Sequence, residues 1–135
     1  MKTGLAIFGS LLLAAVVFAN GNPGPRSEPA AAEFETRCGW FSNPTPANIS
    51  LYDRDAEWTI GVQGGYQVSG DWDWPVFKSG QWVQTNGNYG YGCACLQLRV
   101  NKGTHEVLEI KSARARSLSA CRQDPVLKKW RRLFK

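Results

Sequence analysis

The sequence predicts a mainly β protein: a small antiparallel barrel or sandwich, stapled by disulfides, with a short C-terminal helix. Three observations lead to this fold class. Short segments of alternating apolar residues are separated by Gly, Asn and Asp turn residues. Four cysteines form an even set in a chain that begins with an export signal. About 100 residues remain after that signal and a linker, enough for one domain and too few for two.

The N-terminal residues 1–19 are typical of a signal peptide. Lys2 supplies a positive charge, an apolar stretch follows over residues 5–18, and Ala19 ends a site suited to cleavage. The alternative is a retained anchor, but the stretch is shorter than the roughly 20 apolar residues that span a membrane. Residues 20–35 contain three prolines and few large apolar side chains, so we expect a flexible linker before a single β-rich domain over 36–135.

Five or six short strands are predicted within that domain. They cover, in chain order, 37–41, 48–52, 56–62, 81–85, 89–100 and 104–112. The third strand places Trp58, Ile60 and Val62 on one face. Asn86-Gly87 is the strongest hairpin signal in the chain and predicts that the fourth and fifth strands pair. Many short strands joined by such turns favour a barrel or a sandwich.

The fifth strand carries two cysteines. Leu96, Leu98 and Val100 lie on one of its faces, whereas Cys93 and Cys95 lie on the other. Two cysteines that are two apart on a strand point the same way, and a bond between them would strain the backbone. We therefore expect each of them to bond to a distant cysteine.

The four cysteines Cys38, Cys93, Cys95 and Cys121 accordingly predict two disulfides, with the partner of each C-x-C cysteine left open. A zinc site is the first alternative, but the usual pair of C-x₂-C knuckles is missing. A redox-active C-x-C is the second, but such pairs usually begin a helix rather than lie within a strand.

The C-terminal end is basic and periodic. From residue 20 to 95 there are four basic and eight acidic residues, whereas from 96 to 135 there are eleven basic and three acidic residues. Asp124 and Pro125 suit the start of a helix over 126–134. Its predicted apolar stripe is Val126, Leu127, Trp130, Leu133 and Phe134, and its basic residues are Lys128, Lys129, Arg131, Arg132 and Lys135. The sequence favours packing of this helix on the domain over contact with an anionic surface.

An aromatic and acidic run, Asp71-Trp72-Asp73-Trp74, is the second candidate site. Alternation would place both indoles on one face and both carboxylates on the other. That arrangement suits a glycan platform, in which the indoles stack on a sugar ring and the carboxylates bind its hydroxyls. Core packing is the more common use of aromatic side chains in a small domain, and we favour it here.

Catalysis is not predicted. His105 is the one histidine and follows a glycine turn, so we interpret it as a surface residue rather than a base. A glycosidase would need two carboxyl groups across a cleft, for which about 100 residues leave little room, so a hydrolase is a remote alternative. No cofactor, metal or nucleic-acid partner is expected.

Several motifs resemble one bacterial family of exported proteins, the domain-of-unknown-function family number 4087. They are Arg-Cys-Gly-Trp at 37–40, Asn-Pro-Thr-Pro at 43–46, Gln-Gly-Gly-Tyr at 63–66, Tyr-Gly-Cys-Ala-Cys-Leu at 91–96 and the Cys-Arg-x-Asp at 121–124. The resemblance covers about 36–130 and implies a location in the envelope of a Gram-negative bacterium. It implies no activity.

Together these features predict a non-enzymatic binding or interaction domain, periplasmic or secreted. Its partner would be an envelope protein or glycan, with weak contact to anionic lipid or lipopolysaccharide through the basic end.

Overall fold

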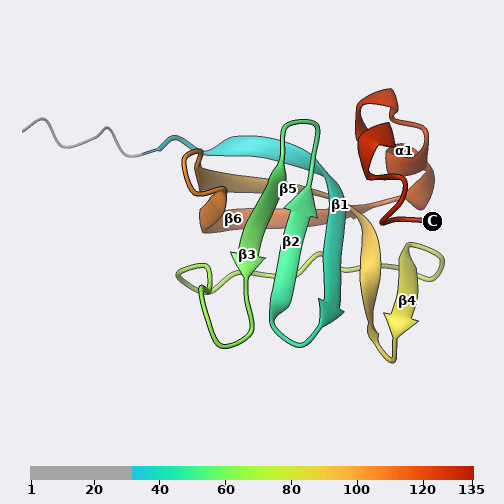
Figure 1. The fold of residues 1–135 in the computed structure, drawn as a ribbon, viewed down its shortest axis with the longest axis horizontal. Coiled ribbons are helices and arrows are strands. Elements are labelled where there is room, and N and C mark those ends of the chain that lie inside the picture. Colours follow the sequence, from blue (N-terminus) through green and yellow to red (C-terminus); the bar gives the residue numbers. More distant parts are fainter. Residues whose placement is uncertain (1–31) are drawn as a thin grey trace, which may run out of the picture. The chain divides into compact units, whose positions relative to one another are not determined.

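The structure, a computed structural model, describes residues 32–135. The predicted signal peptide and all but the last four residues of the predicted linker lie outside this range. The elements are β1 (Glu35–Thr45), β2 (Asn48–Tyr52), β3 (Glu57–Gly61), β4 (Trp82–Asn86), β5 (Tyr89–Asn101), β6 (Glu106–Arg116), α1 (Leu118–Arg122) and the 3-10 helix η1 (Pro125–Trp130). The described part is thus mainly β, as the sequence predicts (Figure 1).

The six strands form one sheet in the order β1-β2-β3-β6-β5-β4, and an additional pairing of β1 with β5 closes it into a ring. Neighbouring strands are antiparallel except at the seam between β3 and β6, where Thr59 pairs with Glu106 in parallel. Residues 66–69 reinforce that seam. Tyr66 donates a hydrogen bond from its hydroxyl to the carbonyl of Val107 at 2.7 Å, and Ser69 bridges to Glu109.

Alternation along the strands produces the core inside the ring. Leu96, Leu98 and Val100 of β5 are buried there, together with Trp58 and Ile60 of β3. Val62, predicted to share that face, is instead exposed. β3 ends at Gly61, and its pairing with β2 has a β-bulge between Thr59 and Gly61 that interrupts the alternation before Val62.

The β4–β5 hairpin forms where Asn86-Gly87 predicts it. The two turn residues are Gly87 and Asn88, one position later than the sequence signal, and Gly87 has a φ of 57°. Gly39 of β1 is required for a different reason. A Cβ atom there would lie 2.0 Å from the carbonyl oxygen of Tyr52 in β2, so only glycine allows this close approach.

The helical end differs from its prediction. The sequence predicts one helix over 126–134, but the structure has the short helix α1 and then the 3-10 helix η1, followed by turns. Asp124 caps η1 as expected, because its side chain accepts a hydrogen bond from the backbone N–H of Val126, and Pro125 starts the helix. The predicted stripe is wrong at Val126 and Leu133, which are 47% and 57% exposed, because the tighter 3-10 helix and the turns that follow do not keep the α-helical spacing.

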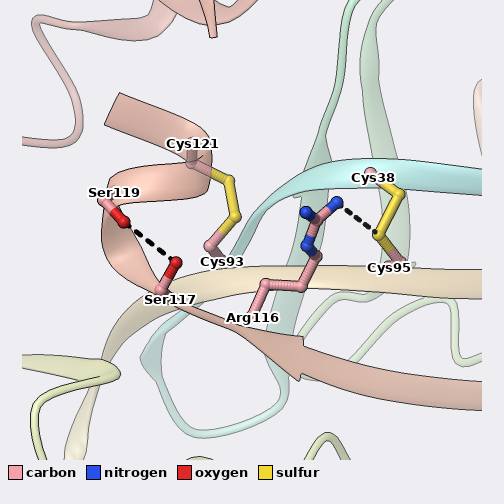
Figure 2. The surroundings of a disulfide bond; sticks show 7 residues. All are labelled: Cys38, Cys93, Cys95, Arg116, Ser117, Ser119 and Cys121. Carbon is pink, nitrogen blue, oxygen red and sulfur yellow. Dashed lines mark hydrogen bonds between the residues drawn. A yellow bond between two sulfur atoms is a disulfide. The ribbon is translucent and has the colours of Figure 1, made fainter. Parts of the chain in front are cut away.

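Two disulfides join these elements, Cys38–Cys95 between β1 and β5 and Cys93–Cys121 between β5 and α1. Both C-x-C cysteines therefore bond to distant partners, as the strand geometry predicts. Figure 2 shows the two bridges near one another, with Arg116 of β6 directed at the sulfur of Cys95. The Cys93–Cys121 bridge attaches α1, and with it the start of the chain's helical end, to the sheet.

Candidate functional site

Residues 118–135, the C-terminal segment, pack against the outer face of β1 and β5. The Phe134 ring is only 6% exposed and stacks on Trp40, with the ring centroids 5.2 Å apart. The same ring meets Tyr52 and Tyr91 edge-on, and Tyr91 donates a hydrogen bond to the carbonyl of Lys135. This segment therefore packs on the domain, which is the alternative that the sequence favours.

Trp130 provides a second attachment. Its indole N–H donates to the carbonyl of Asp53 at 2.7 Å, and its ring lies edge-on to Tyr52 with centroids 5.1 Å apart. Leu127 is buried in the same cluster of side chains, beside the Cys93–Cys121 bridge. The backbone that carries the basic residues is consequently held in place at several points.

The basic surface is the set of five exposed side chains on this held backbone: Lys128, Lys129, Arg131, Arg132 and Lys135. Lys129 donates to the carbonyl of Arg54 at 2.6 Å and lies 5.0 Å from the ring of Trp130. The ion pairs found within residues 32–135 involve none of the five. The exposed Leu133 lies among them in the chain, so the surface combines positive charge with one apolar side chain.

The aromatic pair, Trp72 and Trp74, lies on a different part of the domain. The two indoles stack with centroids 5.3 Å apart and ring planes 18° from parallel, and both meet Phe41 edge-on. This stretch forms no strand, yet it brings the two rings together while Asp71 and Asp73 remain exposed. Trp72 is half-buried against the core, whereas Trp74 is 46% exposed.

An ion-pair network around Arg37 was not predicted from the sequence. The Arg37 guanidinium donates from Nη1 to Asp53 and to Asp55, the latter at 2.9 Å, and from Nε to Glu35 at 3.0 Å. It also lies 4.1 Å from the centroid of the Trp58 ring. Because Arg37 occupies a core-facing position of β1, opposite the turn after β2, the network joins those two elements. The one signal in the sequence is a lone arginine in a strand, together with the acidic turn 53–55.

Burial alone would lower the pKa of Arg37, but its hydrogen bonds to Asp53, Asp55 and Glu35 outweigh burial and raise it. Burial alone would likewise raise the pKa of Asp53, which is 2% exposed. Hydrogen bonds from the backbone of Ala56 and from Arg37 lower it instead. Both groups are therefore held in their charged forms, which suits a structural pair rather than a proton carrier.

His105 is exposed, and its ring centroid lies 5.3 Å from that of Trp58. Within residues 32–135, no cluster of three or more His, Cys, Asp or Glu side chains could hold a metal ion. The helices in this same range include none long and apolar enough to cross a membrane.

These features define a class of protein: a small, mainly β domain with two disulfides and an apolar core inside a ring-closed sheet. One of the disulfides links the C-terminal segment to that sheet. Two disulfides are consistent with an oxidising location outside the cytoplasm.

The chain belongs to the family described as "Protein of unknown function (DUF4087)", whose model matches residues 32–128. This confirms the resemblance seen in the sequence. No curated protein and no solved structure matches the chain. Of the basic surface, only Lys128 lies within the matched residues.

Proposed function

We propose that this chain is a non-enzymatic binding domain that works outside the cytoplasm and contacts an anionic envelope component through the basic surface. One observation carries the proposal. The C-terminal segment buries Leu127 and Phe134 in the domain and leaves all five basic side chains exposed. Anionic lipid and lipopolysaccharide are the partners whose charge this surface complements.

The energetics fit a weak contact. A basic residue near an anionic membrane contributes about 1 kcal/mol, so five of them support association in about the micromolar-to-millimolar range. The backbone is already held by the packing of Phe134 and by the Cys93–Cys121 bridge, so little ordering accompanies binding. Added salt should weaken the contact, because the Debye length falls to about 8 Å at physiological ionic strength.

Vesicle sedimentation tests the proposal. The protein should sediment with phosphatidylglycerol vesicles at low salt and not with phosphatidylcholine vesicles. Shortening the chain would remove the buried Leu127 and Phe134, so the better variant changes all five residues of the basic surface to Gln. A matched control changes five exposed basic residues outside the C-terminal segment to Gln: Lys78, Lys102, Lys111, Arg114 and Arg116. Equal binding by the two variants, or no sedimentation of the wild type, would refute the proposal.

A second candidate function is glycan binding by the aromatic pair. The observation that favours it is the stacked geometry of Trp72 and Trp74, with the second indole exposed. Peptidoglycan fragments or chitin oligomers should then quench tryptophan fluorescence, and Trp74→Ala should abolish the quenching with little loss of stability. If Trp74→Ala instead unfolds the domain, the aromatic pair serves the core. If neither surface binds its ligand, an envelope protein becomes the expected partner.

A further inference from the structure

The C-terminal segment borders a hollow of about 290 Å³ beside β1. Its inner wall is made of buried apolar groups: the side chains of Trp40, Leu127 and Phe134 and the disulfide-bonded Cys121. At about 30 Å³ for each water molecule in the liquid, this space equals about ten waters. It is therefore large enough for a compact ligand and too small for a whole lipid.

The mouth of the hollow is cationic. Its four other lining residues, Arg122, Lys128, Arg131 and Lys135, are all basic and exposed, and none of the lining side chains is acidic. A phosphate monoester carries about −1.5 to −2 charges at pH 7, whereas a carboxylate carries about one. Four cationic side chains, with no acidic side chain in the lining, complement the phosphate better. Arginine also binds phosphate through two parallel hydrogen bonds.

The apolar wall adds a second requirement. Trp40, Leu127 and Phe134 pack on one another and on the domain, and the small edges that they leave uncovered, 3–6% of each residue, are among the groups that line the hollow. A bare phosphate ion would leave these apolar edges in contact with water, so the ligand should also carry an apolar group. We propose that this hollow binds an organic phosphate, with its apolar substituent against Trp40 and Phe134 and its phosphate among the basic side chains at the mouth. This inference rests on the proposed anionic contact, because three of the four basic residues belong to the same surface, and it adds a defined ligand class and location.

The wall is already formed in the structure. Three contacts hold it in place: the stacking of Phe134 on Trp40, the hydrogen bond from the Tyr91 hydroxyl to the main-chain oxygen of Lys135, and the Cys93–Cys121 bridge. A preformed site requires little ordering when the ligand binds, which favours affinity for a small molecule.

Titration calorimetry and amide NMR shifts of the full protein, with three probes, test the proposal. Hexyl phosphate carries both groups, inorganic phosphate lacks the apolar one and hexanol lacks the charge. Hexyl phosphate should bind at least about tenfold more tightly than either of the others, because each group adds its own contacts. Its NMR shifts should centre on Trp40, Leu127 and Phe134. Equal affinity for all three probes, or shifts centred elsewhere, would overturn the inference.

Single substitutions distinguish binding by residues that line the hollow from attraction by the general positive charge of the surface. Arg122→Gln and Arg131→Gln should each weaken hexyl phosphate binding by about tenfold, the effect of losing a charge-assisted contact. Arg132→Gln is the matched control, because it removes the same charge from the next position but does not line the hollow. If Arg132→Gln weakens binding as much as Arg131→Gln, the charge acts only through the general field and the hollow is not the site.

The vesicle assay distinguishes this inference from the proposed function. Hexyl phosphate binding without vesicle sedimentation would refute the membrane contact and support the hollow. Sedimentation that needs the basic surface, without hexyl phosphate binding in the hollow, would refute the hollow alone.

Discussion

Replacing the buried carboxylate Asp53 with its neutral isostere, Asp53→Asn, should destabilise the domain strongly. The Asp53 side chain is 2% exposed and accepts hydrogen bonds from Arg37 and from the backbone N–H groups of Asp55 and Ala56, the last two at 2.7 and 2.9 Å. Asparagine keeps the oxygen that the backbone groups need, but it removes the charge and turns an N–H donor towards the guanidinium. Breaking a buried ion pair from one side costs about 3–5 kcal/mol. Arg37 keeps its two other carboxylate partners, so we expect a loss of about 3 kcal/mol.

Urea unfolding of the purified protein, with its disulfides intact and followed by tryptophan fluorescence, measures this loss. Asp55→Asn is the matched control, because Asp55 contacts the same guanidinium but is 56% exposed, and it should cost less than about 1 kcal/mol. Equal losses in the two variants would refute the account of burial given for Asp53.

The pH dependence provides an independent check. The folded pKa of Asp53 lies below its unfolded value of about 3.9, so its charge stabilises the fold fully above that value. This contribution is lost as the pH falls through the lower, folded pKa. The stability difference between wild type and Asp53→Asn should therefore shrink below about pH 4. A difference that stayed constant down to pH 2 would contradict the assignment.

Three further predictions concern packing and covalent links. Phe134→Ala should lower the free energy of unfolding by about 3–5 kcal/mol, whereas Leu133→Ala, at an exposed site, should change it by less than about 0.5 kcal/mol in the same urea assay. Replacing Cys93 and Cys121 together with Ala should cost about 3–4 kcal/mol in thermal or urea unfolding, from the loop entropy of a 28-residue separation. Gly39→Ala should reduce the yield of folded protein, judged by circular dichroism, because its Cβ would overlap the backbone of β2.

The fold class could be predicted because strand alternation and turn chemistry are local signals. Leu96, Leu98 and Val100 repeat at the strand period, and Asn86-Gly87 specifies a hairpin, so both could be seen without tertiary information. The closure of the ring could not, since the pairing of β1 with β5 joins segments far apart in the chain. The form of the helical end could not be predicted from the sequence either, because tertiary packing and the Cys93–Cys121 bridge decide between one longer α-helix and the two short helices α1 and η1.

The candidate site was predicted in part. The basic residues of 128–135 could be found because they lie close together in the chain, and their exposure agrees with a solvated face. The hollow could not be found, since Trp40 comes from β1 and Arg122 from α1, more than 80 residues apart in the chain. The buried Arg37 network was missed for the same reason. Its members have ordinary surface residue types, and only the ring brings them together.

The position of two cysteines on one face of β5 has a consequence for how the oxidised chain reaches its native alignment. Cys38 lies directly opposite Cys95, and Cys93 lies two residues away on the same face. A slide of β1 by two residues along β5 would keep every apolar side chain on its own face, because the strand period is two. The hydrophobic pattern therefore discriminates poorly between the native alignment and one that offers Cys38 to Cys93. A bond formed in the slid alignment would also leave Cys121 without its native partner. Thiol–disulfide exchange is the reaction that returns such a chain to the native pairing, so the yield of native protein should depend on a compartment, or a refolding buffer, that supplies it.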